Sequence, residues 1–244
     1  MKLIITIILL VASFTISIAQ QISIPNNDSS KKEFVFVLHG LAGGGLTISP
    51  LANRIEDAGF ETQIIDYKTL GTSPDEIMTE VSKKFEDAMP DTNTTVHFVG
   101  YSLGSIVIRA YLDRNKIENL GRVVLIAPPN KGSPIADFCK DTWVIDLFGE
   151  TINFLGTDSS SFPNSIGDPY YPVGIIAGIG TSSFNNFYLP GLDDGIVPLE
   201  STKLNSTTDL IEVNESHVWM KFKKTIAKQT IEFLNNEKFL RDAE

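Results

Sequence analysis

Ser102 stands in a sequence pattern that suits a nucleophile. Gly100, Tyr101, Ser102, Leu103 and Gly104 follow a short apolar run and precede a stretch of helix-forming residues. A strand, a sharp turn and a helix in this order would raise the serine hydroxyl above a sheet, at a helix N-terminus that favours negative charge. The glycines leave room where a Cβ would meet the neighbouring strand and helix. The pattern predicts acyl transfer at Ser102; its plainer interpretation is a tight turn with a small residue at its tip.

A serine nucleophile needs a base within hydrogen-bond reach, and the chain has three histidines. His39 lies in a glycine-rich loop, and His97 lies inside the strand expected before Ser102, where a satisfied core histidine is the ordinary case. His217 directly follows the last expected strand, at the edge of the sheet where ligands bind in open α/β sheets. Elimination therefore predicts His217 as the general base.

An acidic residue must orient this base, and Asp193 and Asp194 lie on the loop before the last expected strand. We choose Asp194, which directly precedes Gly195, as the acid. Asp193 remains the alternative, and a solvated turn is the non-catalytic interpretation of the pair.

The loop after the first expected strand is the candidate for an oxyanion hole. An apolar run ends at Leu38 and continues into a glycine-rich loop that contains His39 and Leu41. The backbone N–H groups of Leu41 and Leu103 are the expected donors, and His39 is expected to fix the loop. The loop lacks the Gly-Lys-Ser/Thr ending of a phosphate-binding loop and the pattern Gly-x-Gly-x-x-Gly, so nucleotide binding is not expected.

Apolar strand patterns alternate with amphipathic helix patterns along most of the chain. This alternation predicts a mostly parallel sheet with helices on both faces and right-handed crossovers. Helix starts are expected at Ser49-Pro50 and at the capping box Ser73 to Glu76. A final amphipathic helix is expected to include Trp219, Phe222 and Phe233. The expected strands cover 34–38, 61–67, 96–99, 122–126, 173–178 and 210–213.

Residues 138–170 do not keep the alternating pattern, because apolar residues are mixed with Gly, Ser and Asp. One interpretation is a helix packed on the sheet followed by a loop. The other is a small cap whose apolar side lines an acyl-binding site. The sequence leaves both open.

The motifs together resemble the lipase and esterase branch of the α/β-hydrolase superfamily. The order Ser102, Asp194, His217 is the chain order of that superfamily. The resemblance implies a compact α/β-hydrolase fold, with a roughly six-stranded sheet and a small cap insertion. It also implies hydrolysis of carboxylic esters, and some such proteins cleave thioesters. The matching segments are His39-Gly40-Leu41, Gly100 to Gly104, Pro128 to Ser133 with Ala136-Asp137, Asp194 to Pro198, and Ser216-His217.

The expected function is a serine hydrolase that cleaves esters of a small molecule or a lipid through an acyl-enzyme, with transient contact at a lipid interface. Two alternatives are a thioesterase with the same triad and a catalytically silent binding module. No cofactor and no metal are expected, since three scattered histidines and one cysteine form no ligand cluster. The net charge of −10 makes nucleic acid a poor partner. The oligomeric state is left open.

The N-terminal residues differ from the rest of the chain. One lysine precedes an apolar run over 3–18, and small residues lie at the −3 and −1 positions of a cleavage site after Ala19. This pattern predicts a secreted or periplasmic protein; the alternative is a membrane anchor made by an uncleaved N-terminus. The expected organisation is a signal peptide over 1–19, a linker over 20–33 and a hydrolase domain over 34–240.

Overall fold

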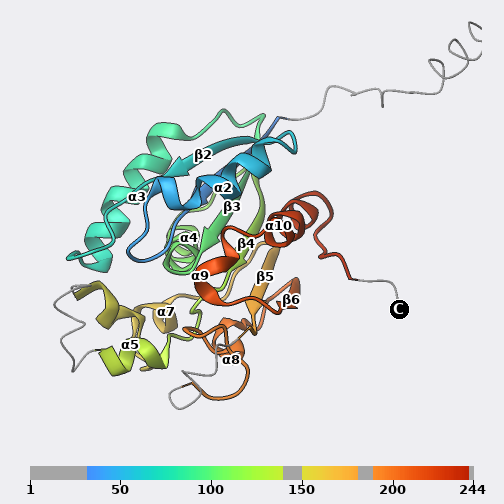
Figure 1. Ribbon diagram of the computed structural model, residues 1–244. Coiled ribbons are helices and arrows are strands. Elements are labelled where there is room, and N and C mark those ends of the chain that lie inside the picture. Colours follow the sequence, from blue (N-terminus) through green and yellow to red (C-terminus); the bar gives the residue numbers. More distant parts are fainter. Residues whose placement is uncertain (1–31, 140–149, 181–188, 242–244) are drawn as a thin grey trace, which may run out of the picture. The chain divides into compact units, whose positions relative to one another are not determined.

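A parallel β-sheet with strand order β2-β1-β3-β4-β5-β6 forms the centre of the structure, a computed structural model that describes residues 32–139, 150–180 and 189–241 (Figure 1). Every neighbouring pair of its strands runs parallel, which confirms the predicted fold class. The predicted signal peptide, the linker up to residue 31 and residues 140–149 of the predicted cap lie outside the described residues. The strands are β1 (Glu33–Leu38), β2 (Glu61–Ile65), β3 (Thr95–Tyr101), β4 (Leu120–Ile126), β5 (Val173–Gly178) and β6 (Asp209–Val213).

Helices cover both faces of the sheet because its strands are buried on both sides. Alternate residues of β1 enter two separate apolar clusters. Val35 and Val37 pack with α2 (Gly45–Glu56) and α10 (Lys224–Asn236). Phe36 packs with α3 (Pro74–Ala88) and α4 (Leu103–Arg114). The shorter helices are α5 (Pro134–Cys139), the 3-10 helix η1 (Glu150–Leu155), α7 (Phe162–Ser165), α8 (Leu199–Thr202) and α9 (His217–Met220). No helix in the described part of the chain has the length and apolar content needed to cross a bilayer.

The predicted capping box before α3 is confirmed, but the predicted start of α2 is wrong. Ser73 caps α3 and exchanges hydrogen bonds with Glu76. In contrast, α2 begins at Gly45, so that Pro50 lies inside the helix. Proline cannot donate to the carbonyl of Leu46 four residues earlier. The hydroxyl of Ser49 donates to that carbonyl instead, at 3.0 Å, which allows the helix to extend towards its N-terminus past the proline.

Two other expected elements have different bounds in the structure. The second strand ends at Ile65, and Asp66 and Tyr67 hydrogen-bond with His39. The expected final helix is divided into α9 and α10. Trp219 is 59% exposed and does not join the buried face of α10.

A bulge between β3 and β4 explains the buried His97. The register shifts between Val96 and Phe98, so that two residues of β4 lie opposite His97. A Cβ on one of them, Gly121, would lie 2.6 Å from the imidazole ring. The N–H of the other, Arg122, donates to Nδ1 of His97 at 2.9 Å. His97 therefore satisfies a backbone donor that the bulge leaves without a strand partner, in line with the structural role expected for it.

His97 should make the fold sensitive to acid. Burial, followed by the charge of Arg122, lowers the pKa of His97 to about 4, against an unfolded value of about 6.5. Between those values the unfolded chain takes up a proton that the folded chain does not bind. The contribution of His97 to the free energy of unfolding is therefore fully present above pH 6.5. It is lost as the pH drops towards 4, by about 3 kcal/mol in total. Urea unfolding between pH 7 and pH 4 should show a smaller loss for His97→Gln, which keeps an acceptor for Arg122 but does not titrate. Equal losses in both proteins would contradict this assignment.

Candidate active site

Ser102 occupies a strained turn between β3 and α4. Its backbone has φ 54° and ψ −120°, a conformation that residues with a Cβ rarely adopt. The N–H of Ser102 donates to the carbonyl of Ile126 at 2.8 Å, which ties the turn to the end of β4. Strain of this kind persists only where the surrounding structure determines it, and it is typical of functional sites.

The two glycines around Ser102 are required by close backbone contacts. A Cβ on Gly100 would lie 2.6 Å from the backbone of Ser105 in α4. A Cβ on Gly104 would lie 2.6 Å from the carbonyl oxygen of His39. Because real Cβ atoms do not approach backbone this closely, glycine at both positions allows β3, α4 and the loop after β1 to meet.

A chain of hydrogen bonds joins Ser102 to His217 and Asp194. Nε2 of His217 lies 2.9 Å from Oγ of Ser102, and Nδ1 lies 2.7 Å from Oδ2 of Asp194. A carboxylate only accepts, so Nδ1–H donates to Asp194 and Nε2 is left to accept the serine proton. Both His217 and Asp194 are buried. The structure thus brings together the three side chains that the sequence suggested from three separate segments.

The neighbouring carboxylates have different partners. Asp194 receives further hydrogen bonds at Oδ1 from the N–H groups of Ile196, at 3.0 Å, and Val197, at 2.7 Å. Oδ1 of Asp193 accepts from the N–H of Gly195, and its buried Oδ2 has no hydrogen-bond partner in the described part of the chain. Burial raises the pKa of Asp193. Asp194, and not the alternative Asp193, is hydrogen-bonded to His217.

Sequence reasoning missed Tyr101, which holds the main chain of His217. Its hydroxyl donates to the carbonyl of His217 at 2.8 Å, and the N–H of His217 donates to the carbonyl of Asp194 at 2.8 Å. Burial, followed by the charge of Asp194, raises the pKa of Tyr101, so the phenol remains a donor. Tyr101 occupies a variable position of the serine motif, so the motif itself carries no signal for this role.

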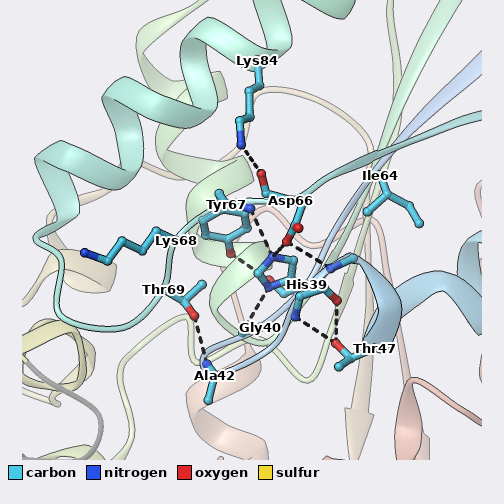
Figure 2. Close-up of polar contacts among 12 residues, drawn as sticks. His39, Gly40, Ala42, Thr47, Ile64, Asp66, Tyr67, Lys68, Thr69 and Lys84 are labelled. Carbon is cyan, nitrogen blue, oxygen red and sulfur yellow. Dashed lines mark hydrogen bonds and ion pairs between the residues drawn. The ribbon is translucent and has the colours of Figure 1, made fainter.

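His39 holds the loop after β1 through its ring and its carbonyl (Figure 2). Nε2 lies 2.9 Å from Oδ1 of Asp66, and Nδ1 lies 3.0 Å from the carbonyl oxygen of Gly40. The ring of Tyr67 stacks on the imidazole, and its hydroxyl donates to the carbonyl of His39 at 2.7 Å. The expected structural role of His39 fits these contacts. Its partners on the segment after β2 were not foreseen, because nothing in the sequence shows that β2 ends at Ile65.

The two residues expected to supply oxyanion donors, Leu41 and Leu103, lie near Ser102. A Cβ on Gly40 would lie 3.0 Å from Cβ of Ser102, so the main chain just before Leu41 runs against the serine. Leu103 is the first residue of α4, and its N–H therefore has no acceptor within the helix. Leu41 also lines the same cavity as Ser102.

An apolar cavity of about 490 Å³ opens beside Ser102 and His217. Cys139, Ile152 and Leu155 on its wall belong to the segment 138–170, for which the sequence left two interpretations. Their position favours the interpretation as the lining of a binding site. The other lining residues are Leu41, Tyr101, Pro129, Ser133, Ile135, Ala136, Ile196, Val197, Val218 and Lys221. Within residues 32–139, 150–180 and 189–241, no group of three or more His, Cys, Asp or Glu side chains could hold a metal ion.

Solved structures share this architecture. The mature form of the Bacillus licheniformis lipase BlEst2 aligns over 84% of this chain and 90% of its own, with a TM-score of 0.63 and 21% identity. The fold is that of an α/β-hydrolase. The metagenomic carboxyl esterase MGS0156 aligns over 79% of this chain and 66% of its own, with a TM-score of 0.60 and 16% identity. No protein-family model and no curated protein sequence matches the chain.

The α/β-hydrolase fold alone does not determine the reaction. Tomato methylketone synthase I, solved in complex with 2-tridecanone, aligns over 86% of this chain and 100% of its own, with a TM-score of 0.54 and 14% identity. At such identities the likeness shows the fold, and function must be argued from the site.

Proposed function

We propose that this α/β-hydrolase is a serine esterase that cleaves carboxylic esters through an acyl-enzyme. The observation that carries the proposal is the unbroken hydrogen-bond chain from Asp194 through His217 to Ser102, next to an apolar cavity. A nucleophile, a base and an orienting acid in this geometry are the components that acyl transfer requires. The similarity to a lipase and a carboxyl esterase supports the same class of substrate.

In the first half of the reaction, Nε2 of His217 takes the hydroxyl proton as Oγ of Ser102 attacks the ester carbonyl. Negative charge develops on the carbonyl oxygen, where the N–H groups of Leu41 and Leu103 would stabilise it. Asp194 holds the tautomer of His217 and stabilises the imidazolium that forms. The imidazolium then gives its proton to the leaving alcohol, and the acyl group stays on Ser102.

In the second half, His217 takes a proton from water, and the resulting hydroxide attacks the acyl carbonyl. The imidazolium returns its proton to Oγ of Ser102, and the carboxylic acid leaves. The acyl chain would lie along the apolar wall that Cys139, Ile152 and Leu155 contribute. A hydrocarbon chain gains free energy on leaving water for such a wall, by about 0.8 kcal/mol for each buried CH₂.

Ser102→Ala should lower kcat/KM for p-nitrophenyl butyrate by about 10⁴-fold or more, because the nucleophile is lost while the binding cavity remains. Circular dichroism should show that the variant still folds. A fluorophosphonate probe should label the wild type at Ser102 and should not label the variant. Absence of labelling in the wild type would favour a silent binding module, and a large preference for butyryl thioesters over oxygen esters would favour a thioesterase.

The adjacent carboxylates provide a matched pair of variants. Asp194→Asn should lower kcat by about 10³–10⁴-fold, because an amide cannot stabilise the imidazolium or hold the required tautomer. Asp193→Asn keeps an oxygen acceptor for the N–H of Gly195 and should change kcat less than about threefold. Both variants are measured with the same p-nitrophenyl ester. Equal losses of kcat would show that Asp194 has no special role.

We also propose that residues 1–19 direct export and are then removed. The proposal rests on the short apolar run and the small residues before position 20. Intact mass of the protein recovered outside the cytoplasm should correspond to a chain that begins at Gln20. A mass that includes residues 1–19 would instead support an uncleaved membrane anchor.

A further inference from the structure

Lys221 brings a positive charge to the wall of the cavity that contains Ser102. It directly follows α9 and lies four residues after His217. Its ammonium group lies 4.8 Å from the ring centroid of Tyr101 and 5.0 Å from that of Phe222. The side chain is therefore held over two aromatic faces, which attract cations.

Lys221 forms no ion pair with a carboxylate of residues 32–139, 150–180 or 189–241. Among the described residues, no Asp or Glu oxygen lies within 4.0 Å of Nζ of Lys221, whereas Lys223 forms an ion pair with Glu215 at 2.9 Å. Asp194 belongs to the same site, but its oxygens already accept hydrogen bonds from His217 and from two backbone N–H groups. Partial burial lowers the pKa of Lys221, which reflects the cost of holding a cation away from water. An anionic ligand would offset that cost.

The leaving group, and not the acyl chain, is the part of an ester that we expect next to Lys221. In acyl transfer the base protonates the departing oxygen, so the alcohol leaves on the side of His217. Lys221 and Val218 extend the cavity wall from His217 along α9 and its end. The wall formed by α5 and η1, in contrast, is contributed by the apolar residues Ile135, Ala136, Cys139, Ile152 and Leu155.

We propose that Lys221 binds a negatively charged group on the alcohol part of the substrate, so that the preferred substrates are esters of anionic alcohols. This inference rests on the proposed esterase function and adds the charge of the leaving group to it. The group recognised is an oxyanion such as phosphate, sulfonate or carboxylate, which a lysine contacts as a compact point charge.

Three butyryl esters of nearly identical shape test this preference. Their alcohols are 2-hydroxyethanesulfonate (anionic), 3,3-dimethylbutanol (neutral) and choline (cationic), and acid release is followed by titration at constant pH. The butyryl ester of 2-hydroxyethylphosphonate and that of glycolate then distinguish the kinds of oxyanion. For the wild type, kcat/KM should be about tenfold higher for the sulfonate than for the neutral ester, and lowest for choline, as expected for one charge-assisted contact.

Variants assign the preference to Lys221. Lys221→Gln should lower the ratio of kcat/KM between the anionic and the neutral ester about tenfold, and Lys221→Glu should reverse the order of the anionic and cationic esters. Lys221→Arg keeps the charge and should keep most of the ratio. Lys223→Gln is the matched control, because Lys223 is paired with Glu215 outside the cavity lining, and it should leave the ratio unchanged.

The outcomes separate this inference from the proposed function. Hydrolysis of the neutral ester without any charge preference in the wild type would overturn the role of Lys221 and leave the esterase proposal intact. An equal loss for all three esters in Lys221→Gln would also overturn it, since Lys221 would then only support Tyr101. If no ester is hydrolysed and the fluorophosphonate probe does not label Ser102, the proposed function itself fails.

Discussion

The contact between Gly104 and the end of β1 is the constraint on which the site depends. With no side chain at Gly104, the first turn of α4 can lie against the carbonyls of Leu38 and His39. The same contact fixes the distance between the serine turn and the loop that begins at His39. Ser102 and the expected donor at Leu41 are therefore positioned by a single close approach of two backbones, and His39, Asp66 and Tyr67 hold the loop in place.

The electrostatics of the site depend on burial and on the different hydrogen-bond partners of two adjacent acids, Asp193 and Asp194. Asp194 is surrounded by donors, so its negative charge is compensated where no water can do so. Asp193 is also buried and accepts the backbone N–H of Gly195 through Oδ1, and burial raises its pKa. Of these two carboxylates, His217 contacts Asp194, whose oxygens also accept two backbone N–H groups.

The sequence was sufficient for the fold and for most of the site, because both depend on local patterns and on chain order. Strand and helix periodicities predicted the parallel sheet, and the edge at which its strands end predicted which histidine meets Ser102. What failed depends on contacts between distant segments. The early end of β2 is set by His39, which lies 27 residues away from Asp66 in the chain. The exception is Pro50, which suggested a helix start because periodicity cannot show that Ser49, within the same turn, supplies the missing hydrogen bond. The position of Lys221 over Tyr101 could not be predicted, because the two residues are far apart in the sequence.

The backbone of Ser102 also bears on how this protein can change over time. The positive φ of Ser102 destabilises the folded chain by roughly 1–3 kcal/mol, whereas glycine adopts such a conformation without this cost. Replacing Ser102 by glycine would therefore relieve strain as well as remove the hydroxyl. The hydroxyl held at this turn therefore comes at a cost in folding free energy that the fold itself does not require.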